Sequence, residues 1–139
     1  MPRTPKSARK KAFRRQSERC CYCSCLMWMT DCEAFARQYG LTVGDTKRLQ
    51  ATAEHLVPRQ DGGSDCSSNI AAACAWCNRQ RHKRKRPPTP ARFRELVMRR
   101  MAQGRWHPLA IHKCGVTIPR HQENDPCSRR QEDRWACSC

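Results

Sequence analysis

Long apolar runs are missing from the sequence. Nowhere do 18 or more apolar residues follow one another, and the basic N-terminus leads into no apolar core of the kind that a signal peptide needs. These absences argue against a membrane-spanning helix and against secretion. We therefore expect a soluble protein of the cytoplasm.

Acidic residues are scarce as well. The 139 residues include 12 Asp and Glu against 28 Lys and Arg, which gives a formal net charge of +16. Such a molecule is attracted to polyanions, and nucleic acid fits this composition better than an acidic lipid surface. The length suffices for one domain, and no internal repeat is visible.

Cysteine, by contrast, is abundant, with 12 in the chain. In a small secreted protein this number would suggest disulfides, but in a reducing compartment a C-x-x-C pair is more often a metal clamp or a redox site. Cys20 and Cys23 form one such pair, and Cys74 and Cys77 form another much later in the chain. Two such pairs complete a tetrahedral thiolate site for zinc.

A zinc ion would supply folding free energy that a core with few large apolar residues cannot. The alternatives are that the thiols are unrelated and buried, or that they form a redox couple. The register of the first cluster stays open, because Cys21 and Cys25 lie beside the pair and another pairing could also reach the ion.

The two ends of the chain differ in composition. Residues 1–19 carry eight Lys and Arg against one Glu, and we interpret them as a mobile basic arm that can become helical from Ser7 onward. This arm either contacts phosphates or is simply solvated. Residues 119–139 are polar and unpatterned, which predicts a disordered tail. Residues 20–118 are expected to form the folded domain.

Between these ends, short extended segments alternate with helices. A helix is expected after Asp31, ending at Gly40. Residues 49–57 favour a short strand and residues 69–77 a second one, although the alanines of the second suit a helix equally well. The last expected elements are helices over 78–86 and about 90–103 and an extended segment over 105–119.

The stretch "AEHLVPRQDGG", residues 53–63, places an acidic residue beside a histidine, Glu54 and His55. Asn69, Asn78 and His82 follow it. Positions i and i+4 share a helix face, so Asn78 and His82 can direct an amide oxygen and an imidazole at one point. With Glu54 as a third ligand from the strand opposite, this set suits a catalytic divalent cation better than a closed structural ion.

These polar residues also have simpler interpretations. Asn78 could be the N-cap of its helix, Asn69 could merely cap a turn, and His82 could be a solvated member of the run "RQRHKRKR". Three further histidines match no motif: His107, His112 and His121.

The segments "CCYC", "AEHLVPRQDGGSDCSSN" and "CAWCNRQRH" occur in this order, and together they resemble the HNH endonucleases. The close resemblance covers residues 53–86, or 20–86 if the segment "CCYC" is counted. It implies an α+β protein with a small ββα-metal, treble-clef-like core over residues 50–86, stapled by a structural zinc and flanked by helices and basic tails. It also implies double-stranded DNA as the partner, a catalytic Mg²⁺ or Mn²⁺ besides the Zn²⁺, and a bacterial or phage-infected cell as the setting.

By the same resemblance, His55 is the general base, Glu54 and Asn78 bind the catalytic metal, and Asn69 holds the loop that orients the histidine. His82 matches the last metal-binding histidine of the colicin-type members. Glu54 stands where the family often has Asp or His.

The chemistry of phosphodiester hydrolysis asks for the same residue types. An imidazole can accept a proton from water at neutral pH, and a divalent cation stabilises the negative charge that builds on the phosphate and the leaving oxygen. The basic run would neutralise the DNA backbone through Arg79, Arg81, Lys83, Arg84, Lys85 and Arg86.

We therefore expect a metal-dependent HNH DNA endonuclease. The rival interpretation is a non-catalytic zinc module that binds nucleic acid through its basic surface. A third is an RNA-binding or ribosome-associated structural protein.

Overall fold

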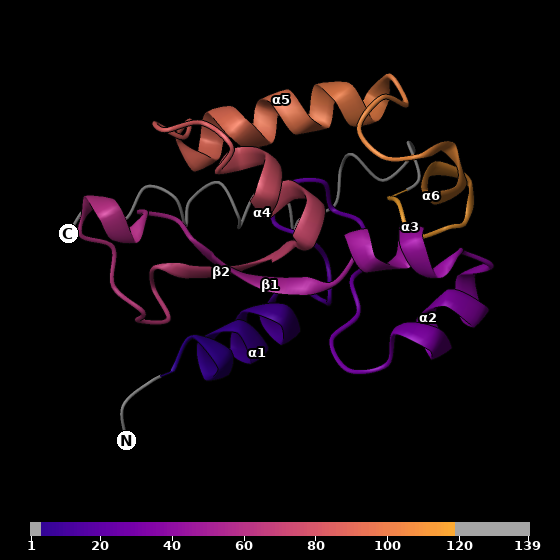
Figure 1. Ribbon diagram of the computed structural model, residues 1–139, viewed down its shortest axis with the longest axis horizontal. Helices are drawn as coiled ribbons and strands as arrows, with labels where there is room; N and C mark the ends of the chain where they lie inside the picture. Colours follow the sequence, from indigo (N-terminus) through magenta and orange to yellow (C-terminus); the bar gives the residue numbers. More distant parts are fainter. Residues whose placement is uncertain (1–3, 119–139) are drawn as a thin grey trace.

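A two-stranded antiparallel hairpin forms the centre of the protein (Figure 1). The computed structural model describes residues 4–118, so the expected tail over 119–139 lies outside the described residues. Strand β1 spans Ala51–His55 and strand β2 spans Ile70–Cys74. They pair from Ala51 opposite Cys74 to His55 opposite Ile70. This register puts the cysteine end of β2 beside the start of β1 and leaves His55 at the opposite end of the hairpin.

Helix α4, Ala75–Arg81, follows β2 directly and completes a ββα unit with the hairpin. The ambiguous segment 69–77 is thus a strand that passes into a helix at Ala75. The helix ends at Arg81 rather than at 86 as expected, because the four consecutive cations from Lys83 to Arg86 would repel one another in a further turn. The α+β class with a small ββα core agrees with the expectation.

Helix α1, Pro5–Arg15, covers the face of the hairpin opposite α4 (Figure 1). Its side chains at Ala8, Ala12 and Phe13 are buried. Just beyond it, the Gln16 side chain both donates to and accepts from the backbone of Ala72 (2.8 and 2.9 Å), which caps the outer edge of β2. The expectation of a mobile arm is therefore wrong for residues 5–15, where the apolar face outweighs the charge of the exposed face.

The remaining helices surround this unit. Helices α2 (Cys32–Tyr39) and α3 (Val43–Arg48) precede β1, with Asp31 as the N-cap of α2 and Gly40 at its end. Helix α5 spans Pro90–Ala102 behind the N-cap Thr89 and packs Phe93 and Val97 into the core. The expected extended segment over 105–119 is wrong, because a short helix, α6, forms at Leu109–Lys113 behind Pro108. Within residues 4–118, no helix is both long and apolar enough to cross a membrane.

The loop between the strands depends on two glycines. It contains a 3₁₀ turn, η1, at Arg59–Asp61, and Gly62 follows this turn with φ 86°, a left-handed conformation that favours glycine. A Cβ atom on Gly63 would lie 1.8 Å from the carbonyl oxygen of Val57. The loop can therefore close only with glycine at position 63.

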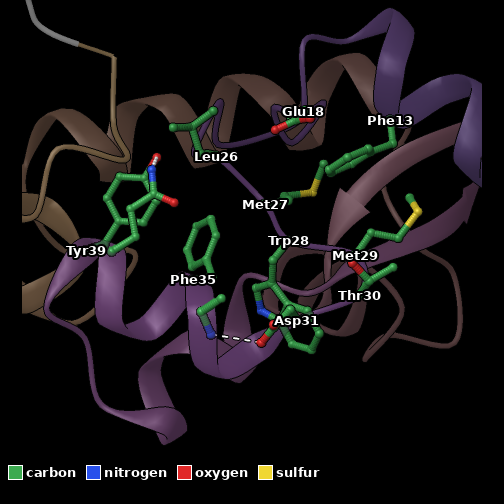
Figure 2. A pocket seen from close by; sticks show the side chains of 12 residues that line it. Phe13, Glu18, Leu26, Met27, Trp28, Met29, Thr30, Asp31, Phe35 and Tyr39 are labelled. Carbon is green, nitrogen blue, oxygen red and sulfur yellow. Dashed lines mark hydrogen bonds between the residues drawn. The ribbon is translucent and has the colours of Figure 1, made fainter.

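A pocket of about 310 Å³ opens beside α2 (Figure 2). Aromatic side chains of Phe13, Trp28, Phe35 and Tyr39 line it together with the acidic Glu18 and Asp31. None of the residues that line this pocket belongs to the site expected from the sequence, so the pocket is a feature separate from the chemistry described next.

Candidate active site and metal centre

Four thiols converge where β2 enters α4. The Sγ atoms of Cys20, Cys23, Cys74 and Cys77 all lie within 4.8 Å of one another, and all four residues are buried. The Cys23 and Cys74 sulfurs are 3.8 Å apart. A tetrahedral ion with bonds of about 2.3 Å would place its sulfurs about 3.8 Å apart, so the set fits a structural metal such as zinc.

Burial raises the pKa of the Cys74 and Cys77 thiols well above the ordinary value, and a bound cation would favour their thiolate form. Cys21, which might have competed for the ion, is outside the converging set. Cys25 instead groups with Cys23 and His107.

Glu54 is fully buried and has more partners than the sequence suggests. Its Oε1 accepts a hydrogen bond from the Tyr22 hydroxyl (2.9 Å) and an ion-pair bond from Arg81 Nη1. Its Oε2 lies 3.1 Å from His82 Nε2. Burial raises the pKa of Tyr22, so the hydroxyl keeps its proton and remains a donor.

Arg81 is a structural residue rather than a nucleic-acid contact, and that expectation is wrong. Its side chain is 2% exposed. Besides Glu54, its guanidinium donates to the backbone oxygens of His55, Leu56 and Pro88 at 3.0 to 3.1 Å. These bonds attach α4 to the end of β1. Arg79 and the run Lys83, Arg84, Lys85 and Arg86 are exposed, as a phosphate contact requires.

Glu54 and His82 form the best-placed pair for a catalytic cation. His82 Nε2 is within hydrogen-bond distance of both Glu54 oxygens (3.2 and 3.1 Å), so the two side chains could instead present an oxygen and an imidazole nitrogen to one cation. Asn78 lies inside α4, not at its N-cap, which is Cys74. The Asn78 amide nitrogen donates to Thr52 Oγ1 (3.0 Å) and to the carbonyl oxygen of Ala53 (3.1 Å), so its oxygen points away from these partners.

The His55 ring faces the loop rather than Glu54. Its Nε2 lies 2.7 Å from Asp65 Oδ1, and Arg59 donates to the same carboxylate oxygen (2.9 Å). Arg59 Nε also lies 3.2 Å from His55 Nε2. The shorter contact to Asp65 decides the arrangement, with Nε2 as the donor, because the carboxylate already satisfies the arginine. Among the described residues, no hydrogen bond joins the His55 ring to Glu54 or His82.

Asn69 closes this loop. Its side-chain oxygen accepts from the Val57 amide (2.8 Å), and its side-chain nitrogen donates to the carbonyls of Val57 (3.0 Å) and Ser64 (2.9 Å). Both ends of the segment that carries Asp65 are thereby fixed relative to His55.

Residues 41–84 match the family model described as HNH endonuclease. This segment is an HNH domain. It includes β1, the glycine loop, β2 and α4, and therefore both polar clusters, Glu54 with His82 and His55 with Asp65; Tyr22, Cys20, Cys23, Lys85 and Arg86 lie outside it. Neither a curated protein nor a solved structure matches the chain. The matched segment is of a nuclease-type family, for which nucleic acid is the class of substrate.

Three residues of the HNH domain or its surroundings escaped the sequence interpretation. Asp65 gave no local signal, because its contact with His55 depends on loop closure. Arg81 did give one, since it follows the buried Cys77 by four residues and so shares its helix face. Tyr22 lies between Cys20 and Cys23, before the matched segment, and its hydroxyl donates a hydrogen bond to Glu54.

Proposed function

We propose that the protein is a metal-dependent DNA endonuclease with His55 as its general base. The observation that carries the proposal is the pair of polar clusters at the end of the hairpin where His55 faces Ile70. One, His55 with Asp65, fits a base held in one orientation; the other, Glu54 with His82, fits a cation site. Both lie in the HNH domain.

His55 would accept the proton of the attacking water on Nδ1. Asp65 accepts the hydrogen of Nε2, so the lone pair of the neutral ring resides on Nδ1. A general base of this kind contributes roughly 10²- to 10⁴-fold to the rate. The imidazole is 17% exposed, so water and a phosphodiester can reach it.

Glu54 and His82 would hold a divalent cation, Mg²⁺ or Mn²⁺, with Asn78 as a further oxygen ligand. When bound, the cation stabilises negative charge on the phosphate and on the departing oxygen. Arg81 and Tyr22 hold Oε1 of Glu54, and His82 Nε2 lies 3.2 Å from Oε1 and 3.1 Å from Oε2, so Oε2 is the oxygen that neither Arg81 nor Tyr22 occupies. Following the family, the products would carry 5′-phosphate and 3′-hydroxyl ends.

The exposed cations of the proposed nuclease, Arg79 and residues 83–86, would contact the backbone of double-stranded DNA. We place the nuclease domain at residues 20–118, in the cytoplasm of a bacterial or phage-infected cell. Helix α1 then adds a packed cover to this domain on the far face of the hairpin.

A plasmid-nicking assay tests the proposal. Cleavage should require added Mg²⁺ or Mn²⁺ and stop with EDTA. It should fall by 10²-fold or more, about the contribution of a general base, in His55→Ala, while DNA binding in a gel shift survives. His112→Ala, which alters a histidine outside the HNH domain, is the control and should cut like the wild type. If the purified protein binds DNA but does not cut it with any of the divalent ions added, it is instead the non-catalytic zinc module.

A further inference from the structure

Backbone amides serve two of the four sulfurs in the proposed zinc site. Cys20 Sγ accepts from the amides of Tyr22 (3.4 Å) and Cys74 (3.3 Å), and Cys74 Sγ accepts from the amide of Cys77 (3.4 Å). Within residues 4–118, no backbone amide donates to the sulfur of Cys23 or Cys77. The sulfurs of Cys23 and Cys77 would therefore need hydrogen bonds from side chains if they are thiolates.

Two consecutive side chains lie against these other two sulfurs. Trp106 Nε1 donates to Cys77 Sγ (3.2 Å), and His107 Nε2 lies 3.5 Å from Cys23 Sγ. Both residues are buried, with exposed fractions of 7% and 5%. They follow α5 and so come from outside the matched segment 41–84. Backbone amides thus donate to the sulfurs of Cys20 and Cys74, and side chains lie against the other two.

The protonation of His107 follows from its surroundings. Its Nδ1 is buried and has no hydrogen-bond partner. A hydrogen on Nδ1 would be a buried donor left unpaired, whereas a hydrogen on Nε2 meets Cys23. The favoured tautomer therefore has its hydrogen on Nε2 and donates it to the sulfur.

Packing restricts the direction of the Trp106 donor. The Trp106 ring meets Phe93 and Trp76 edge-on, with centroids 5.9 and 6.3 Å apart. The indole cannot turn away from Cys77 without losing these ring contacts. His107, which immediately precedes Pro108, the N-cap of α6, is buried as well.

Four thiolates around one Zn²⁺ carry an excess of negative charge, and a buried charge is unfavourable unless hydrogen bonds stabilise it. We propose that Trp106 and His107 are positioning residues of the zinc site, whose N–H groups hold Cys77 and Cys23 as thiolates and so determine how tightly the protein retains zinc. The inference rests on zinc occupying the four-cysteine site, and it is independent of nuclease activity.

The competing possibility is a second ion. Cys23, Cys25 and His107 also lie within 4.8 Å of one another and could hold one. A metal on Nε2 would force the hydrogen onto the unpartnered Nδ1, whereas metal-binding histidines almost always donate their other N–H to a partner. The structure therefore favours the hydrogen bond over the second ion.

The test measures zinc retention in the full chain. Trp106→Phe keeps the ring and removes the N–H, while His107→Leu removes the donor and His107→Gln replaces it. Zinc content by native mass spectrometry and competition with a chromophoric chelator should show one zinc in the wild type. Retention should be about 10- to 100-fold weaker in Trp106→Phe and His107→Leu, the usual range for partners of metal ligands, and should largely recover in His107→Gln.

Two variants control for a general loosening of the core. Trp28→Phe removes an indole N–H that donates to the Thr46 carbonyl oxygen (2.7 Å), and Thr46→Val removes a buried hydroxyl that donates to the Thr42 carbonyl oxygen (2.8 Å); neither group contacts a sulfur in the described residues. Both should retain zinc like the wild type. Unchanged retention in Trp106→Phe and His107→Leu would overturn the proposal, and so would equal losses in the two controls. A wild type with two zinc ions, one of them lost in His107→Leu, would establish the second ion instead.

A charge-transfer spectrum provides an independent readout. With Co²⁺ in the four-cysteine site, the sulfur-to-metal bands should shift in Trp106→Phe because the electron density on Cys77 changes. A wild type that binds no metal would remove the basis of this inference and leave the nuclease proposal to the plasmid assay.

Discussion

The two ends of the hairpin treat their charged groups in different ways. At the end where Ala51 faces Cys74, four buried thiols converge and could hold a metal ion. At the end where His55 faces Ile70, the carboxylates have cationic partners within the protein: the buried Glu54 pairs with Arg81, and the partly exposed Asp65 pairs with Arg59. We therefore expect the first end, the zinc end, to need its ion to fold, whereas the second, the site end, should fold before a catalytic ion arrives.

Tyr22 couples the two ends. It lies between Cys20 and Cys23, and its hydroxyl donates a hydrogen bond to Glu54 (2.9 Å). A disturbance of the zinc end should therefore pass to Glu54, while a change at His55 should leave the zinc end intact.

Removing a zinc ligand should have the largest effect. Cys74→Ser should lose zinc and unfold the domain, since structural zinc contributes about 10–16 kcal/mol in small zinc domains. Metal analysis and thermal melts followed by circular dichroism measure this. Cys32→Ser, at a half-buried cysteine of α2, is the matched control and should keep zinc. Unchanged zinc content in Cys74→Ser would contradict the assignment.

Breaking the internal ion pair comes next. Arg81→Met should lower the free energy of unfolding by about 3–5 kcal/mol in urea, because it leaves the Glu54 carboxylate buried without a counter-charge. Glu54→Gln combined with Arg81→Met should recover part of this loss. Arg79→Met, on the exposed side of the same helix, should change stability by about 0.5 kcal/mol at most. A small effect of Arg81→Met would mean that the charge of Glu54 does not depend on Arg81 for its compensation.

Variants of Asp65 test whether this residue sets the tautomer of His55 without contributing to folding. Asp65→Asn can present an N–H to His55 Nε2 and so favour the tautomer with its hydrogen on Nδ1, which blocks the proposed base. We expect a loss of about 10²-fold in kcat, a cost typical of a misplaced catalytic group, with zinc content and melting temperature retained. Asp65→Ala should lose less, because it imposes no tautomer. If Asp65→Asn cuts as fast as the wild type, Nδ1 is not the base. Asp61→Asn, in the same loop, is the control.

Tyr22→Phe tests the coupling between the ends. Removing one hydrogen bond to the buried carboxylate should cost about 1.5–3 kcal/mol of unfolding free energy, the range for bonds to charged groups. Zinc content should stay at the wild-type level, because the knuckle cysteines are unchanged. Loss of zinc in this variant would show that the zinc end depends on the site end.

The basic run should have the most gradual effect. Replacing Arg84 and Arg86 with Ala should weaken binding to duplex DNA and reduce the slope of log affinity against log salt by about 0.9 for each phosphate that the protein no longer neutralises. Arg37→Ala, an exposed charge-matched change on α2, should leave that slope unaltered. Equal slopes for all variants would place the DNA elsewhere.

The sequence permits prediction of those parts of the fold that depend on local spacing. Ligand spacing placed Cys20, Cys23, Cys74 and Cys77 as a candidate metal set, and these four do converge. The order of strand, glycine loop, strand and helix could be predicted for the same reason, because each step has a local signal in turn residues and apolar pattern.

The errors arise where charge masks an apolar face or where contacts form between distant segments. Residues 5–15 look like a solvated arm, yet Ala8, Ala12 and Phe13 share one face that packs on the hairpin. Arg81 looks like a member of a basic run, although its position four residues after Cys77 places it on the buried face of α4. His107 matches no motif, because its partner Cys23 lies far away in the chain.

Gly63 has a consequence for anyone who exchanges loops between HNH domains. The atom that a side chain there would strike is the carbonyl oxygen of Val57, which is part of the main chain and has no rotamer by which to move aside. Libraries that randomise the loop should therefore leave this position untouched and vary Gln60 and Asp61 instead, where the side chains are exposed. A transplanted loop without this glycine would shift Val57 from Asn69 and carry the whole hairpin connection out of register.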